Sequence, residues 1–311
     1  MEIIPVWRDT IVKYTLTDLV DSVTYKIYLQ NGSTPIFTGR AYRRPNTDYV
    51  EFKINKIAEN YLKQSLGDGS MAVNTFYVYI DEKPLAPYAF YYAYDYTQGS
   101  ITDKCMVLSS PINNKVASEG KIVFSALNAT NSTYTLNVEK LVNGTWSNHT
   151  IEYIPKGSLV NKIYDVADFI NATKIRVMDK IWDIVCADYQ LIYLNKYGGY
   201  DVVNLNGKLG KVDNMSSKSY TKSYNNTTNE WGENKYNNVI TTEYEGHIYF
   251  LNQKQSETLD NLYCSTEVYL YDINKDIMKP VIIKDSSLDY QSYKKLRVFK
   301  IKMAESQKRK R

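Results

Sequence analysis

The sequence predicts a mainly β protein with a few short helices, arranged as tandem β-sandwich-like domains. Short alternating segments recur along the chain; in the clearest, VTYKIYL, Val23, Tyr25, Ile27 and Leu29 share one face. Asn-Gly pairs, which favour the tight turns of β-hairpins, separate several such segments. The 311 residues include 30 Tyr, a residue that favours strands and protein interfaces. These three observations also predict a chain built for assembly.

Residues 1–103 form the first predicted domain. A turn at Asn31-Gly32 is expected to join two strands of a hairpin. A helix is predicted over residues 54–66, because apolar residues recur there at helical spacing, and Gly67 is expected to end it.

The segment PYAFYYAYDYTQ, residues 87–98, closes this domain. Its alternation predicts a strand with an aromatic core face. On the opposite face Tyr91 lies between Ala89 and Ala93, small neighbours that are expected to leave its ring open to a partner protein.

Residues 104–188 form the second predicted β domain. A turn at Asn143-Gly144 is expected to join two strands. A helix is predicted over residues 158–171, with Ser158 as its N-cap.

Residues 189–311 form the third predicted domain, which is β-rich. Residues 213–238 are Ser, Asn, Thr, Lys and Tyr with scarcely an aliphatic residue, and predict a long polar loop that is mobile or ordered by a partner. A short helix is expected over residues 256–264, followed by three strands. The segment from Lys294 to Arg311 contains nine basic residues and one acidic residue. This basic tail is either a solvated terminus or a contact for nucleic acid or an acidic partner.

Composition excludes several classes of protein. The net charge of +4 gives a weak overall field and no argument for nucleic-acid binding. Cys105, Cys186 and Cys264 are too few and too far apart for a disulfide framework or a CxxC metal site, so reduced thiols are expected. Neither a signal peptide nor an apolar run of membrane-spanning length is found.

Catalytic motifs are also missing, so the sequence predicts no enzyme, no cofactor and no metal site. The two histidines, His149 and His247, are isolated, and no GxSxG, HExxH or phosphate-binding loop occurs. DINKDIMKPVII begins like a calcium loop but lacks its glycine and its final glutamate. Paired carboxylates for glycoside hydrolysis stay open as an alternative. The nearest candidates are Asp165 with Asp168 and Asp179 with Asp183.

Aromatic residues leave carbohydrate stacking open as a second alternative. The tryptophans that could serve are Trp7, Trp146, Trp182 and Trp231. Tyrosines that alternate along strands are nevertheless more often core and interface residues than a stacking platform.

Three stretches resemble known phage proteins. LIYLNKYGGYDVVNLNGK and CSTEVYLYDINKDIMKPVIIKDSSLDYQSYKKLRVFKIKMAE resemble the C-terminal part of virion structural proteins of the crAss-like podoviruses of Bacteroides. PIFTGRAYRRPNTDYVEFKINKIAENYL resembles the beginning of such proteins. The resemblance implies a β-rich neck or tail component that forms homo-oligomeric rings and helps to conduct DNA without binding its sequence.

The resulting expectation is a non-enzymatic virion protein, a tail or neck ring subunit made in the cytoplasm of the bacterial host. Its expected partners are copies of itself, other tail, neck or portal-complex proteins, and passing DNA, with no membrane. The candidate interface residues are Tyr91, Tyr224, Trp231, Tyr236, Lys308, Arg309, Lys310 and Arg311. The alternatives are a carbohydrate- or receptor-binding adhesin of the tail tip and, third, a hydrolase with paired carboxylates.

Overall fold

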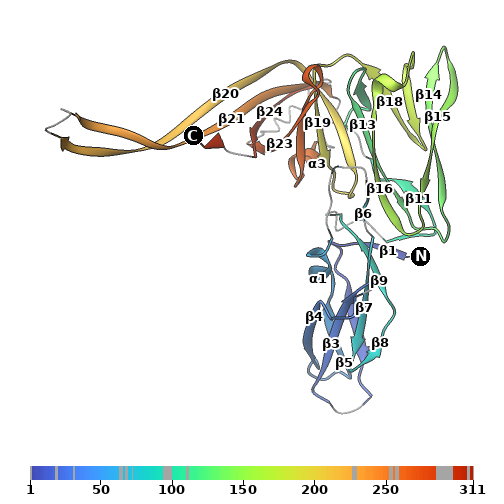
Figure 1. Ribbon diagram of the computed structural model, residues 1–311. Helices are drawn as coiled ribbons and strands as arrows, with labels where there is room; N and C mark the ends of the chain where they lie inside the picture. Colours follow the sequence, from blue (N-terminus) through green and yellow to red (C-terminus); the bar gives the residue numbers. More distant parts are fainter. Residues whose placement is uncertain are drawn as a thin grey trace. The chain divides into compact units, whose positions relative to one another are not determined.

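The computed structural model is mainly β with short helices and several separate sheets, so the predicted fold class is confirmed (Figure 1). The described residues are 2–17, 20–30, 32–62, 66, 69–71, 73–93, 100–109, 112–225, 230–251, 255, 259–284, 297–306 and 309–310. The chain divides into two compact units, each assembled from three segments. Unit 1 comprises Met1–Ser110, Ile122–Asp183 and Asn195–Asp201, and unit 2 comprises Pro111–Lys121, Ile184–Leu194 and Val202–Arg311.

The first sheet of unit 1 has the strand order β10-β1-β9-β7-β3-β4, with β8 beside β7. Its strands are β1 (Glu2–Pro5), β3 (Ser22–Leu29), β4 (Phe37–Tyr42), β7 (Asn74–Ile80), β8 (Lys83–Pro84), β9 (Tyr88–Tyr91) and β10 (Ile101–Thr102). The pair β2 (Ile11–Thr15) and β5 (Tyr49–Lys53) lies with helix α1 (Asn55–Glu59) on the core of this sheet. Ile27, Val78 and Phe76 are fully buried in that core, as the alternation of their strands predicts.

The helix predicted over residues 54–66 is much shorter, since α1 covers five residues. The predicted hairpin is confirmed by the antiparallel pairing of β3 with β4, while Asn31 of its expected turn lies outside the described residues. Gly67, the expected helix end, lies outside the described residues.

Two further sheets complete unit 1. One has the order β11-β13-β16-β6, and the other contains β18, β17, β14 and β15 in that order. The Asn143-Gly144 turn between β14 and β15 is confirmed, and both of its residues have positive φ, as a type I′ turn requires. The strands are β6 (Gly69–Met71), β11 (Cys105–Val107), β13 (Lys121–Asn128), β14 (Tyr134–Val142), β15 (Thr145–Ile154), β16 (Ser158–Asp165), β17 (Lys174–Val177) and β18 (Lys180–Val185).

The helix predicted over residues 158–171 is wrong. The segment is strand β16 followed by a 3-10 turn, η1 (Val166–Asp168). β16 lies between β13 and β6, so both of its edges are paired and its Val and Ile side chains pack well as a strand. Ser158 caps no helix; its Oγ donates to the Pro155 carbonyl at 2.7 Å.

Unit 2 is built on a sheet that closes on itself. The order is β20-β19-β22-β23-β24-β21, and β20 pairs with β21 to complete the ring. Leu191, Leu205, Ile248, Ile301 and Met303 fill its core. Its elements are β12 (Lys115–Ala117), β19 (Tyr189–Leu194), β20 (Tyr200–Asn225), β21 (Glu230–Leu251), α3 (Asp260–Tyr263), β22 (Val268–Asp272), η2 (Ile273–Lys275), β23 (Ile277–Lys284), β24 (Arg297–Glu305) and β25 (Arg309–Lys310).

The polar loop predicted over residues 213–238 is wrong, because most of it belongs to β20 and β21. The three closing strands are confirmed as β22, β23 and β24. The short helix is reduced to α3, and Ser256, its expected cap, lies outside the described residues. The predicted domain boundaries at 103/104 and 188/189 stay predictions.

Candidate interaction surface

The most prominent surface of unit 2 is the two-stranded ribbon formed by the outer parts of β20 and β21, which extends beyond the closed sheet (Figure 1). The register runs from Lys211 opposite Tyr244 to Asn225 opposite Glu230. These strands have 26 and 22 residues, several times the usual five or six. A two-stranded ribbon without a covering layer is marginally stable in water, so this one presents a surface that a partner would stabilise.

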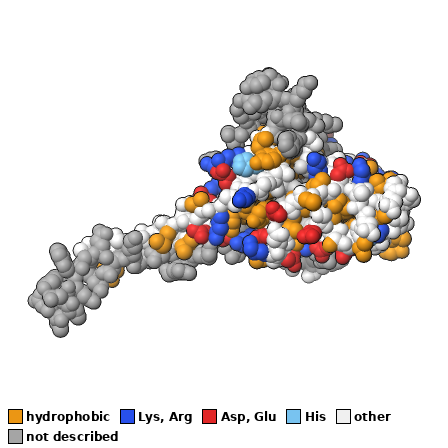
Figure 2. Space-filling view, turned by 90° about the horizontal axis from the view of Figure 1, so that it is seen from above, with side chains coloured by type: hydrophobic (Ala, Val, Ile, Leu, Met, Phe, Trp, Pro, Cys, Tyr) orange, Lys and Arg blue, Asp and Glu red, His pale blue; other side chains and the backbone are white. Residues whose placement is uncertain are grey.

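Apolar side chains are exposed on both faces of the ribbon. Val212 is 58% exposed on one face, and Met215 is 62% exposed on the other. Tyr220 is half exposed nearer the tip. Figure 2 shows hydrophobic and charged side chains side by side where the ribbon leaves the unit.

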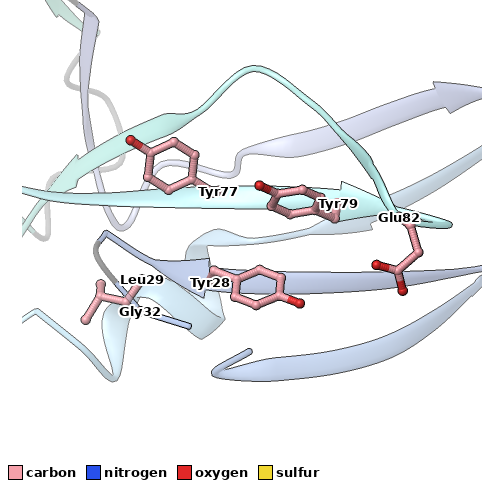
Figure 3. A pocket seen from close by; sticks show the side chains of 6 residues that line it. All are labelled: Tyr28, Leu29, Gly32, Tyr77, Tyr79 and Glu82. Atoms are coloured by element: carbon pink, nitrogen blue, oxygen red, sulfur yellow. The ribbon is translucent and has the colours of Figure 1, made fainter. Parts of the chain in front are cut away.

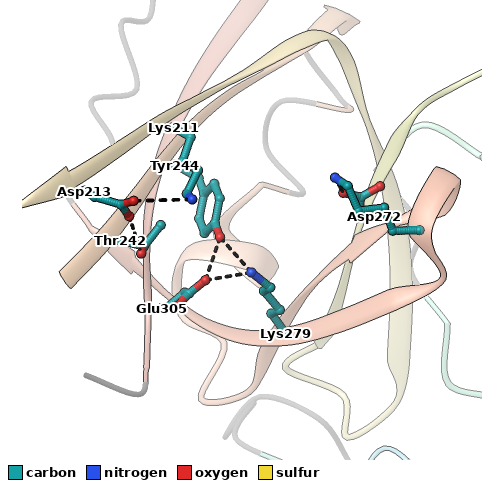
Figure 4. Close-up of polar contacts among 8 residues, drawn as sticks. Lys211, Asp213, Thr242, Tyr244, Asp272, Lys279 and Glu305 are labelled. Atoms are coloured by element: carbon teal, nitrogen blue, oxygen red, sulfur yellow. Dashed lines mark hydrogen bonds and ion pairs between the residues drawn. The ribbon is translucent and has the colours of Figure 1, made fainter. Parts of the chain in front are cut away.

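A hydrogen-bonded group holds the base of the ribbon to the closed sheet (Figure 4). The Tyr244 hydroxyl donates to Glu305 Oε1 at 2.6 Å, and Lys279 Nζ donates to the same carboxylate at 2.9 Å and to the Tyr244 oxygen at 3.1 Å. Burial, followed by the bond to Glu305, raises the pKa of Tyr244. The hydrogen bond to Glu305 raises the pKa of Lys279. The three groups fix β21, β23 and β24 to one another.

Ion pairs continue this group along the base. Lys284 pairs with Glu243 at 2.5 Å, and Lys300 pairs with Glu245 at 2.7 Å. In each pair the lysine hydrogen bond lowers the pKa of the carboxyl group. A cavity of about 360 Å³ lies among these side chains. Since basic and acidic groups alternate, this base suits a partner of mixed charge better than a polyanion such as DNA.

The described structure brings part of the predicted basic tail to the ribbon. Arg309 and Lys310 form β25, whose backbone pairs with Ile240 and Val239 of β21. Tyr224, Trp231 and Tyr236 are predicted interface residues on β20 and β21 themselves, where only the backbone is described. Lys308 and Arg311 lie outside the described residues.

Tyr91 is not on this surface, and the expectation that its ring lies open was wrong. The side chain is fully buried in a core with Ile3, Leu127 and Leu159. Strand β9 is buried on both faces, because Phe90 packs into the core of the first sheet. The small neighbours Ala89 and Ala93 therefore make room for packing within this chain.

A second surface, which sequence reasoning missed, lies on the outer face of the first sheet (Figure 3). Tyr77 and Tyr79 alternate with the buried Phe76 and Val78 along β7, and Tyr28 of β3 lies directly opposite Tyr77. With Glu82 these rings line a cavity of about 490 Å³. The signal was present in TFYVYI and VTYKIYL, whose alternation fixes the faces of both strands.

Among the remaining aromatic candidates, Trp7 is 39% exposed, with the Lys56 ammonium 5.2 Å from the centre of its ring. Trp182 is buried in the core, and the Arg176 guanidinium covers the Trp146 ring at 4.3 Å. His149 stacks on Phe169 at 4.0 Å, and burial lowers its pKa. In the part of the chain that the structure describes, no group of three or more His, Cys, Asp or Glu side chains could hold a metal ion.

Comparisons with protein-family models and with curated protein sequences find no match. Of the helices described, none is long and apolar enough to cross a membrane.

Proposed function

We propose that this chain is a non-enzymatic structural subunit of a phage virion. It forms a homo-oligomeric ring in the tail or neck and connects neighbouring tail proteins, and the β20–β21 ribbon is its contact with the next subunit. The observation that carries this proposal is the ribbon itself, with strands of 26 and 22 residues and exposed apolar side chains on both faces. An isolated two-stranded ribbon is costly to keep ordered, and a neighbour that buries it removes that cost.

Ring closure requires a head-to-tail contact, in which one surface of a subunit meets a different surface of the next. A ribbon suits this geometry because it reaches away from the sheet that anchors it. Its exposed backbone edges and its Met215 and Val212 side chains offer hydrogen bonds and apolar area to the neighbour.

A shortened variant tests the proposal. Residues 217–238 are replaced by an Asn-Gly turn that joins Ser216 to Val239, which are opposite each other in the ribbon. This change keeps the pairing of Val239 and Ile240 with β25 and leaves the closed sheet untouched. We expect the full chain to form a ring in native mass measurement and electron microscopy. The shortened chain should give a monomer, 20 residues smaller than the full 36.0 kDa chain, that still unfolds cooperatively.

A matched control replaces Tyr153, an exposed residue of β15 in unit 1, by alanine. This variant should assemble like the full chain. The proposal is contradicted if the unaltered chain is a monodisperse monomer in solution and forms no ring in the virion. It is also contradicted if the shortened variant assembles into a normal ring.

A further inference from the structure

We infer that the outer face of β3 and β7 is a binding site for a neutral saccharide, stacked on Tyr28, Tyr77 and Tyr79. This inference is independent of the ring assembly proposed above, because it concerns only residues 22–84 of unit 1. Its starting point is a face of a sheet that carries three phenol rings next to one charged pair.

The backbone fixes the three rings in place. Tyr28 and Tyr77 are paired across β3 and β7, and Tyr79 follows on the same face of β7. The opposite faces of both strands are held in the core by Ile27 and Val78, which are fully buried. The rings therefore need little reordering when a ligand binds.

The rings do not fill the face by packing flat on one another. Tyr28 and Tyr79 meet edge to face, with centroids 5.2 Å apart and an angle of 72°. Tyr77 remains 37% exposed beside them. Aromatic faces left open in this way can cover the C–H face of a pyranose ring, while the phenol hydroxyls reach its substituents.

A charged pair closes one side of the site. Lys26 Nζ donates to Glu82 Oε1 at 2.6 Å, and Lys26 lies opposite Tyr79 in the register of the two strands. The pair offers both donors and an acceptor to sugar hydroxyls, and its charges compensate each other. A quaternary ammonium ligand, which aromatic cages also bind, would meet a Glu82 carboxylate whose charge Lys26 already compensates, so a neutral ligand fits better.

The cavity has the size of a small-molecule site. Its volume of about 490 Å³ lies within the usual range for such sites and accommodates a short saccharide. Aromatic walls with a few convergent polar groups are the usual composition of such pockets.

Saturation-transfer NMR on the full chain, with a panel of neutral mono-, di- and trisaccharides, tests the inference. We expect at least one sugar to bind through its C–H protons, and Tyr77→Ala to weaken that binding at least tenfold. Tyr79→Phe keeps the ring and should bind within about threefold of the unaltered chain. Glu82→Gln, a change in an exposed turn that leaves the core intact, should weaken binding at least threefold.

Tyr42→Ala is the matched control. Tyr42 is 66% exposed on β4 and is paired with Ser22, six residues along β3 from Tyr28, or about 20 Å away. Binding by this variant should stay within twofold. The inference is overturned if no sugar binds, if Tyr42→Ala weakens binding as much as Tyr77→Ala, if Glu82→Gln has no effect, or if choline binds at the rings in place of sugars. Since the readout is ligand binding, its failure leaves the ring proposal standing, and the reverse also holds.

Discussion

At the scale of single residues, the turn in YLNKYGGYD shows what its asparagine and glycines do for the fold. Asn195 Oδ1 accepts hydrogen bonds from the backbone nitrogens of Tyr197 and Gly199, and Asn195 Nδ2 donates to Asp201 at 2.7 Å. Gly198 has φ +84°, and a Cβ there would lie 2.1 Å from the Tyr92 carbonyl oxygen. Asn195 and Gly198 therefore have a structural role in this turn.

Gly198→Ala should destabilise the protein strongly. The substitution adds a left-handed conformation for a non-glycine residue to an overlap with backbone, and together these cost about 3 kcal/mol or more. Urea unfolding followed by circular dichroism measures the loss.

Gly144→Ala provides the matched control for this effect. Gly144 also has a positive φ, +79°, but nothing lies within 4 Å of its added Cβ. Its replacement should cost only about 1 kcal/mol. Equal losses for the two variants would show that close packing at Gly198 contributes nothing.

The three thiols should differ in reactivity. Cys105 is buried, which raises its pKa to about 11, so only about one part in a thousand is thiolate at pH 8. Cys186 and Cys264 are exposed. We expect a thiol reagent to label two cysteines in the native protein and the third only after denaturation, as mass mapping of the labelled peptides can establish.

The Glu139–Arg176 pair should make stability depend on pH. The guanidinium donates to both carboxylate oxygens, at 2.6 and 2.8 Å, and this hydrogen bonding lowers the pKa of Glu139. A carboxyl whose pKa is lowered in the folded state contributes stability above its unfolded pKa and loses it as the pH falls through the folded pKa.

The test is Glu139→Gln. The variant should melt at a lower temperature than the parent at pH 7, and the difference should narrow below about pH 4.5 and vanish at lower pH. Parallel melting curves across that range would contradict this role for the pair.

At the scale of elements, the sequence predicted strands that bury one face against a core and expose the other. It did not predict strands whose formation depends on pairing with segments distant in the sequence. In residues 23–29, buried and less buried side chains alternate because one face of the strand meets a core and the other meets solvent. Residues 158–171 carry apolar residues that fit a helix period as well, and only the flanking β13 and β6 decide in favour of a strand. The sequence does not contain that choice locally.

The ribbon escaped prediction for a different physical reason. Alternation arises when one face of a strand is buried, but residues 211–221 are exposed on both faces with hardly an exception. A polar stretch with that pattern resembles a loop. The Thr242 hydroxyl donates a hydrogen bond to Asp213 across the ribbon at 2.6 Å. This bond could not be predicted without knowing that the two strands pair.

A truncation tests the pairing of β25, the described end of the basic terminus, with β21. A chain ending at Ser306 lacks β25 but retains Glu305, which bonds to Tyr244 and Lys279. We expect an unchanged melting temperature, with faster amide hydrogen exchange at one of Val239 and Ile240, the partners of β25, because the N–H groups of consecutive strand residues point to opposite edges and the other faces β20. Unchanged exchange at those two amides would contradict the pairing.

At the scale of the whole molecule, the segments of each unit are far apart in the sequence, which limits how the chain can be divided. The closed sheet of unit 2 needs β19, from residues 189–194, between β20 and β22. A fragment of residues 202–311 leaves those two strands with unpaired edges and opens the core.

Fragments should therefore differ in folding. Residues 202–311 alone should show no cooperative urea transition, whereas residues 112–311 retain β19 and also Ile112 of the same core, and should show one. Cooperative unfolding of the shorter fragment would contradict the account of the closed sheet.

The sequence singled out residues 213–238 and the basic end as an interaction surface, which stays a prediction, and it did not predict that they form strands. The polar stretch and the basic end were both expected to meet partners, and the structure brings β25 onto the ribbon. The prediction that Tyr91 is exposed was wrong because alternation indicates which residues share a face, and not whether other side chains cover that face. The Tyr77 and Tyr79 rings were missed because the alternation of TFYVYI shows that they share a face, but not that this face stays uncovered and meets Tyr28 of another strand.

The pairing pattern of the ribbon also governs how its length can change through evolution. Opposed residues share a face and faces alternate along each strand, except at the register shifts between Ser216 and Lys218 and between Lys222 and Asn225. Away from these shifts, removing or adding two residues in both strands keeps every remaining side chain on its own side. Each such step alters the span by about 7 Å. A change of one residue in one strand instead requires a further bulge of the kind already present at the two shifts. Insertions and deletions between residues 211 and 244 should therefore come in matched even numbers or coincide with a bulge, a rule that related sequences can test directly.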